Sequence, residues 1–296
     1  MTKLTKELTH KPFFGAVWMI LAGACFAAIN TTSQYLSIRL GLHNTLVGFF
    51  QYFISFLVML PWMIKTGLST ALKTQHIWMH LLRVFTSVIG IQLWLWALAY
   101  PIPIWQAIAL VMTSPLFVTI GSSLFLKEKV GIARWSATLV GFIGSLIILE
   151  PWSDDFQVAS LLPIAAAFFW AIYSLMTRIM TATENTGSLV IYLLILIAPM
   201  NLILALPNFT LPTQPMWLWL IFSGTLLAIA QWSLARAYAN ADASFIQPFD
   251  LLKLPLNVYA GWLVFGYVPP GRLWLGALLL VSSTIFILHR EHRQDK

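Results

Sequence analysis

The sequence predicts an all-α integral membrane protein with ten transmembrane helices, arranged as two inverted-topology repeats of five helices each. Three observations support this fold class. Of the 296 residues, 59% are hydrophobic and only 9% are charged, whereas about 25% are charged in an ordinary soluble domain. Apolar runs of spanning length recur along the whole chain, and the two halves share a pattern of motifs. A water-soluble globule is therefore excluded.

Ten apolar runs are bounded by proline, glycine or charged residues, and each has roughly the 20 residues that a spanning helix needs. Because lipid offers the backbone no hydrogen-bond partner, each run must satisfy its own amides as an α-helix. The first run is too long for a signal-peptide core, so we expect it to be retained. The expected helices cover residues 13–37, 45–64, 77–99, 105–126, 132–150, 158–180, 187–206, 216–238, 244–266 and 272–289.

Basic residues predict the orientation. With a cytoplasmic N-terminus, 13 of the 17 Lys and Arg fall in the tails and inner loops, only Arg39 and Arg272 fall outside, and Arg83 and Lys253 lie within spans. Positive loops face the cytoplasm, so the tails 1–12 and 291–296 are both expected there. This scattered distribution accounts for the net charge of +7 without a nucleic-acid partner.

An internal repeat divides the chain into residues 13–150 and 157–290. Residues 96–100 compare with 234–238, and residues 126–135 compare with 265–274, at an offset near 139. Chance similarity between apolar segments is the alternative explanation. Each half holds five spans, an odd number, so the second half enters the membrane in the opposite sense. Many secondary transporters use such a repeat to build one site at the bilayer midplane.

Several motifs keep the order and spacing of one known family. They are Arg83, Ala97, Tyr100, Pro103, Pro115, Leu126, Glu128, Gly131, Trp135, Gly141, Gly144 and Pro151 in the first half, and Ala237, Tyr238, residues 241–248 and Pro255 in the second. With these marks the chain resembles the EamA-type branch of the drug/metabolite transporter superfamily over residues 13 to 290. One position departs from the pattern, because Tyr267 stands where the second half should repeat the carboxylate of Glu128.

The resemblance implies a carrier or exporter of a small polar metabolite, such as an amino acid, a vitamin or an amine. It also implies a cavity between the third and fourth helices and their counterparts, the eighth and ninth. The inverted repeat predicts transport by alternating access around such a cavity. The compact loops and the resemblance favour a multi-pass protein of a bacterial inner membrane. Neither a cofactor nor a metal is expected.

Asp250 and Lys253 are the most informative residues, because a charge near the bilayer centre is costly and is functional by default. They are spaced i and i+3 in the expected ninth helix, so they share one helical face and can pair with each other. In the functional interpretation they contact a charged or zwitterionic substrate, or Asp250 takes up a coupling proton. The alternative is an internal ion pair that only holds helices together.

A polar stripe supports the functional interpretation. Gln247 and Asn257 repeat with Asp250 at helical spacing and so extend the same face. Pro248 and Pro255 lie on either side of Asp250, and each removes a backbone donor, which kinks or locally opens a helix. A simple packing kink is the alternative.

Other helices carry weaker candidates for substrate binding, for which hydrogen bonding between helices is the alternative role. They are Asn30 in the first expected span, Trp94 in the third, Gln106 and Thr113 in the fourth, Tyr173 in the sixth and Gln231 in the eighth.

Three further residues are assigned gating or structural roles. Arg83 lies near enough to the cytoplasmic end of its span to snorkel to the interface. Glu128, between Lys127 and Lys129, is expected to cap a helix or form a salt bridge at the interface, and Pro115 lies in the fourth span.

Enzyme and metal chemistry find little support. The sequence lacks HExxH, GxSxG and a glycine-rich phosphate loop. His76 and His80 have the i, i+4 spacing of metal ligands but no evident third ligand, so we expect them to be solvated. The alternatives to a carrier are a channel or lipid translocase with a continuous pathway, whose flux would not saturate, and an intramembrane enzyme.

Overall fold

A computed structural model describes residues 11–66, 72–74, 76–99, 108, 110–111, 113–128, 130–149, 161–266, 275, 278–279 and 282. Throughout these residues the regular elements are helical, which confirms the all-helical prediction. The helices are α1 (Pro12–Gln34), α2 (Asn44–Thr66), α4 (Ile77–Ala99), α6 (Ser114–Phe125), α7 (Ile132–Leu149), α8 (Leu161–Met180), α9 (Thr186–Ala205), α10 (Gln214–Asn240), α11 (Ala243–Asp250) and α12 (Lys253–Phe265), with a π-turn at Tyr35–Arg39 and a 3-10 turn at Leu206–Asn208.

Among the described residues, six helical segments are long and apolar enough to cross a membrane. They are Pro12–Arg39, Asn44–Lys65, Ile77–Trp94, Leu161–Met180, Thr186–Asn208 and Gln214–Asn240, and Ser114–Phe125 and Ile132–Gly144 are shorter apolar helices. Large apolar side chains such as Trp78, Ile132 and Leu218 are exposed on the surface, as a lipid-facing surface requires. The protein is therefore a multi-pass membrane protein. Most of the expected span 272–289 and the start of the span 105–126 lie outside the described residues.

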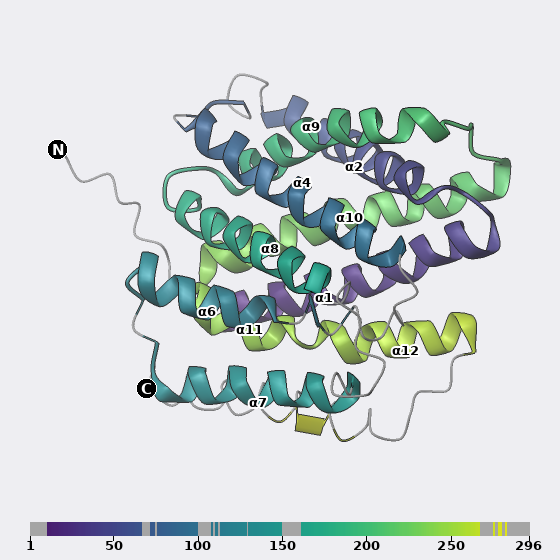
Figure 1. Cartoon of the computed structure of the whole chain (residues 1–296). Helices are drawn as coiled ribbons and strands as arrows, with labels where there is room; N and C mark the ends of the chain where they lie inside the picture. The colour runs from purple at the N-terminus through teal and green to yellow at the C-terminus, as the bar shows by residue number, and fades with distance from the viewer. Residues whose placement is uncertain are drawn as a thin grey trace.

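The helices run side by side, and their connections gather at two opposite ends of the bundle (Figure 1). The α1–α2 and α9–α10 connections lie at one end, which we call the α1–α2 end. The α8–α9 and α10–α11 connections lie at the other, the α8–α9 end. In the interior, α1 packs along α10, α4 packs along α8, and α2 packs against both α9 and α10.

Small residues allow α1 and α10 to approach closely. A Cβ added to Gly15 would lie 2.6 Å from the Cβ of Ala241, so only glycine fits there. The buried Ala16 and Ala237 belong to the same hydrophobic cluster. At the α8–α9 end, the Lys11 N–H donates a hydrogen bond to the Asn240 carbonyl at 2.9 Å. The start of α1 is therefore tied to the end of α10.

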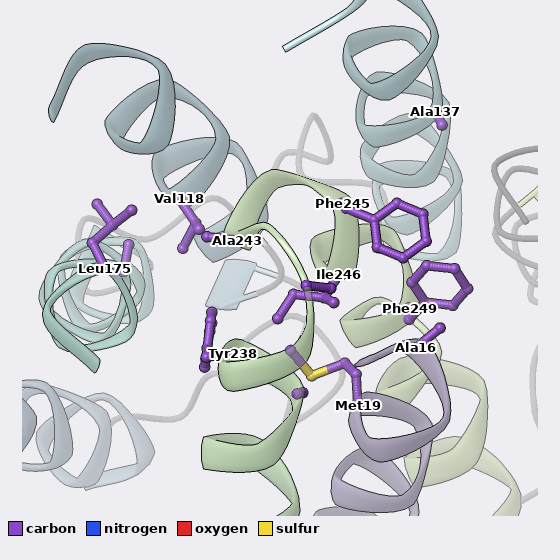
Figure 2. Packing of buried hydrophobic residues seen from close by; sticks show 13 residues of the cluster. Ala16, Met19, Val118, Ala137, Leu175, Tyr238, Ala243, Phe245, Ile246 and Phe249 are labelled. Atoms are coloured by element: carbon purple, nitrogen blue, oxygen red, sulfur yellow. The ribbon is translucent and has the colours of Figure 1, made fainter. Parts of the chain in front are cut away.

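All eight residues of α11 are buried. Phe245, Ile246 and Phe249 pack in one cluster with Met19 of α1 and Ala137 of α7. Figure 2 shows the two phenylalanine rings on the side of Ala137 and Ala16, with Ile246 beside Met19. Because neighbouring helices enclose α11 on every side, its orientation is fixed by packing.

The single helix expected over residues 244–266 is wrong, because the chain breaks at Leu251–Leu252 between α11 and α12. Pro255 has no N–H to donate to the Leu251 carbonyl, which a continuous helix would require. The backbone tightens instead, and the Leu252 and Leu254 amides donate to carbonyls three residues earlier, at 3.2 and 3.1 Å. The local opening expected from the prolines is thus a break between two half-helices.

Replacing Gly15 by valine should destabilise the protein by about 1–3 kcal/mol through overpacking against α10. Gly48→Val is the matched control, because Gly48 is also helical and no atom lies within 4 Å of its added Cβ. Thermal unfolding of the detergent-purified protein measures both. Equal melting temperatures for the two variants would contradict the close packing of α1 on α10.

Candidate transport site

A cavity of about 210 Å³, which we call the chamber, lies inside the bundle. Residues of α1, α2, α4, α6, α8, α10, α11 and α12 line it. The described lining residues are Phe26, Asn30, Tyr52, Ser87, Ile91, Trp94, Ile108, Val111, Ser114, Trp170, Tyr173, Ser174, Gln231, Leu234, Tyr238, Gln247, Asp250, Lys253 and Asn257.

A second cavity of about 480 Å³, the vestibule, adjoins the chamber and extends to the α1–α2 end. Its wall includes Ser37, Asn44 and Thr45, which flank the α1–α2 connection. The two cavities share part of their walls, which we call the neck. The neck consists of Phe26, Asn30, Tyr52, Ile91, Trp94, Ile108 and Trp170.

Most of the substrate-binding residues proposed from the sequence come together in the chamber wall. Eight of them line it, namely Asn30, Trp94, Tyr173, Gln231, Gln247, Asp250, Lys253 and Asn257. Thr113 is not among the lining residues, and its hydroxyl donates to the Leu110 carbonyl at 2.7 Å. Gln106 lies outside the described residues.

Asp250 and Lys253 form an ion pair across the break between α11 and α12. The Asp250 Oδ1 and Lys253 Nζ atoms are 2.6 Å apart, and the ammonium also lies 5.4 Å from the ring centre of Phe26. Asp250 ends α11 and Lys253 begins α12. A carboxylate at a helix C-terminus and an ammonium at an N-terminus are both disfavoured by the helix dipole, so each charge depends on the other.

Hydrogen bonds orient the chamber's amide side chains. The Asn30 Nδ2 donates to the Asn257 Oδ1 at 3.0 Å, and the Asn257 Nδ2 donates to the Lys253 carbonyl at 2.7 Å. The Gln247 Nε2 donates to the Tyr238 hydroxyl at 3.2 Å. An amide has two donor hydrogens and two acceptor lone pairs, so these bonds use only part of its capacity. The chamber can both donate to and accept from a ligand.

Aromatic rings dominate the neck. The ring centres of Trp94 and Trp170 are 6.3 Å apart with planes at 51°. The Trp170 indole lies directly against α4, because its Nε1 is 2.5 Å from where a Cβ of Gly90 would be. Phe26 and Tyr52 come from α1 and α2. Sequence analysis did not propose Phe26, Tyr52 or Gly90, because nothing local distinguishes them from residues that pack against lipid or other helices.

Arg83 is buried and does not snorkel as expected, since only 1% of it is exposed. One guanidinium nitrogen donates to the Leu189 carbonyl at 2.6 Å, and another donates to the Thr177 hydroxyl at 3.3 Å. The guanidinium carbon lies 5.2 Å from the ring centre of Tyr173. Arg83 therefore joins α4 to α8 and α9 behind the chamber wall.

The expectation that both histidines are solvated is wrong for His80. That residue is fully buried, and its ring stacks on Tyr192 with 4.2 Å between ring centres. Within the described part of the chain, no group of three or more His, Cys, Asp or Glu residues can hold a metal ion.

Four charged residues form an ion cluster at the α8–α9 end, namely Glu128, Arg134, Arg178 and Asp242. Arg178 lies 3.5 Å from the Glu128 carboxylate and 3.1 Å from that of Asp242. Arg134 pairs with the other oxygen of Asp242 at 3.2 Å. The cluster therefore connects residues of both halves of the chain.

Glu128 also caps the N-terminus of α11. Its carboxylate accepts hydrogen bonds from the Ala243 and Ser244 amides, at 3.1 and 3.2 Å, and from the Ser244 hydroxyl at 3.0 Å. These amides have no partner within the helix, and the helix dipole favours an anion there. Pro115 is the second residue of α6, in the first turn, where its missing N–H is not needed.

Sequence and structure comparisons relate this chain to known proteins. The model of the EamA-like transporter family matches residues 13–150 and 157–289. The chain belongs to the EamA-like transporter family. A "Riboflavin transporter" of Vibrio cholerae serotype O1 is 59% identical over 98% of this chain and 98% of that protein. Another "Riboflavin transporter", from Rhizobium johnstonii, is 47% identical over 95% of this chain and 93% of that protein.

A solved crystal structure shares the fold of this EamA-like protein. Its TM-score is 0.74 with 17% sequence identity, over 96% of this chain and 98% of that chain. Together with the family match and the relatives, the apolar helices identify a multi-pass membrane transporter of small metabolites, not an enzyme.

Removing one charge of the Asp250–Lys253 pair should destabilise this transporter more than removing both. Asp250→Asn or Lys253→Met alone should cost about 2 kcal/mol. That is less than the roughly 3–5 kcal/mol of a fully buried pair, because the two side chains keep 11% and 21% exposure to the cavity.

The double variant should recover part of the loss, which thermal unfolding in detergent measures as a double-mutant cycle. Simple addition of the two single losses would contradict an energetic dependence of each charge on the other.

Proposed function

We propose that this protein carries riboflavin across a bacterial inner membrane by alternating access. The observation that carries the proposal is the combination of an aromatic neck with an amide-lined, charge-balanced chamber. The names of the two relatives support the same substrate.

Riboflavin matches this cavity chemically. Its isoalloxazine ring is planar and uncharged, and it can stack on the tryptophans of the neck. The pyrimidinedione edge of that ring carries two carbonyls and one N–H, which complement side-chain amides such as Gln231, Gln247 and Asn257. Because Lys253 is already paired with Asp250, a neutral ligand enters without leaving an uncompensated charge.

The proposed architecture has ten spans in two inverted repeats, residues 13–150 and 157–290, with both termini in the cytoplasm. In the proposed repeat, α1 corresponds to α8 and α10 corresponds to α4. The packed pair α1 and α10 therefore has a counterpart in the packed pair α8 and α4, which supports this architecture. The counting of Lys and Arg assigns the α8–α9 end to the cytoplasm. The α1–α2 end is then the outer end.

In this orientation the structure corresponds to an outward-facing state. The vestibule extends from the chamber to the outer end, and the ion cluster links the two halves at the cytoplasmic end. Inward opening requires these contacts to separate. Asp250, the one carboxylate among the described chamber residues, is the proposed acceptor of a coupling proton.

Purified protein in liposomes should take up riboflavin with saturable kinetics and should exchange internal for external riboflavin. Trp94→Ala should weaken riboflavin binding about tenfold, since it removes a stacking partner worth roughly 1–1.5 kcal/mol. Trp78→Ala on the same helix is the control, because that ring is 79% exposed on the surface.

Flux that neither saturates nor exchanges would contradict the carrier and favour the channel or lipid translocase. Saturable transport of S-adenosylmethionine, an organic cation, without transport of riboflavin would contradict the proposal that riboflavin is the substrate.

Weakening the ion cluster should open the chamber to the cytoplasm. The reporter is Ser174→Cys in the chamber wall, on a Cys25→Ser background that removes the single native cysteine. In inside-out vesicles, a membrane-impermeant thiol reagent should label this cysteine slowly. Glu128→Gln should raise the labelling rate about threefold or more, because the substitution weakens an ion pair and charged hydrogen bonds in the cluster.

Lys127→Gln is the matched control, since Lys127 is exposed and adjacent in the chain. An unchanged labelling rate in the Glu128→Gln variant would contradict a gating role of the cluster.

A further inference from the structure

The vestibule differs from the chamber in its chemistry. Around it, the described lining residues include no Asp, Glu, Lys, Arg or His side chain, whereas the chamber contains the Asp250–Lys253 pair. The polar lining of the vestibule consists of amides and hydroxyls, among them Ser33, Gln34 and Gln51. Such a surface suits an uncharged ligand with many hydroxyl groups.

Asn201 of α9 gives a second observation that points to a ligand. It lines the vestibule and is only 6% exposed, yet its Nδ2 has no hydrogen-bond partner within the described part of the protein. The Ser37 hydroxyl, also in the vestibule wall, is buried without a partner there as well. Buried polar groups in proteins are almost always hydrogen-bonded. Both atoms are buried within the vestibule wall, so each gains a partner from a ligand only when its side chain turns toward the vestibule.

We infer that the vestibule is a polyol subsite, which binds the ribityl chain while the isoalloxazine ring occupies the neck. This inference rests on the proposed transport of riboflavin. The shared wall of the two cavities allows one ligand to span both. The pyrimidinedione edge then faces the chamber amides, and the ribityl hydroxyls accept from Asn201 and bond with Ser37 and Gln34.

The orientation of the flavin follows from the difference between the two cavities. The chamber holds fixed donors and acceptors around an ion pair, which suits the rigid polar edge of the ring. The vestibule is larger and lacks charge among its described residues, which suits a flexible chain of hydroxyls. A phosphate on that chain would be desolvated there without a cation, so the subsite selects riboflavin over its phosphate ester.

The test compares three flavins that differ only in the side chain of the ring. Riboflavin, lumiflavin (which carries a methyl group in place of the ribityl chain) and riboflavin 5′-phosphate are titrated into purified protein, and quenching of flavin fluorescence gives each Kd. Asn201→Leu should raise the Kd of riboflavin about five- to tenfold, the effect of losing one buried hydrogen bond, and leave that of lumiflavin within twofold. Asn208→Leu is the matched control, because Asn208 lies at the same end and is exposed.

A second variant tests the subsite by a gain of affinity, which a folding defect cannot produce. Gln34→Arg adds a cation to the vestibule and should lower the Kd of riboflavin 5′-phosphate about tenfold, whereas the Kd of riboflavin should not fall.

Equal effects of Asn201→Leu on riboflavin and lumiflavin, or no gain with Gln34→Arg, would overturn the polyol subsite and leave riboflavin transport standing. Failure of the unmodified protein to bind either riboflavin or lumiflavin would overturn the proposed function itself.

Discussion

The break between α11 and α12 is the feature on which the candidate transport site depends. Pro255 withholds an amide hydrogen from the Leu251 carbonyl, and the ninth helix is broken at Leu251–Leu252. Two helix ends therefore lie inside the bundle, and each carries the charge that its own dipole disfavours. The ion pair between Asp250 and Lys253 compensates both ends at once. The enclosed packing of α11 holds this arrangement in place.

The ion cluster holds the start of α11 at the α8–α9 end of the bundle. The Glu128 carboxylate satisfies the free amides at the start of α11 and contacts Arg178. The half-helix that ends at the ion pair is thus held at its start by charges from the other half of the chain. In the proposed repeat, Tyr267 stands at the position that matches Glu128, so the two halves of the sequence differ at this position.

The two cavities combine balanced charge with an aromatic surface. The chamber pairs its charges internally, and the neck is lined by rings from four helices, α1, α2, α4 and α8. Gly90 is essential to this shape, because a side chain there would collide with Trp170 and displace the indole from α4. The size and orientation of the neck thus depend on a residue that presents no side chain to it.

The sequence by itself determined the class of protein and much of the site. Composition and run length predict membrane helices because the backbone in lipid must satisfy its own hydrogen bonds. Charges within an apolar run mark Asp250 and Lys253 because burying them is costly. The spacing of Gln247 and Asn257 extends their face because helical periodicity is local.

Only the tertiary structure decided which polar and aromatic residues meet, since contacts between helices depend on packing across long sequence separations. Tyr52, Phe26 and Asn201 resemble many other residues of apolar helices, and they enter the cavities only through the pairing of α1, α2 and α9 with their neighbours. For the same reason Arg83 and His80, which the sequence allows to reach water, are buried against α8 and α9.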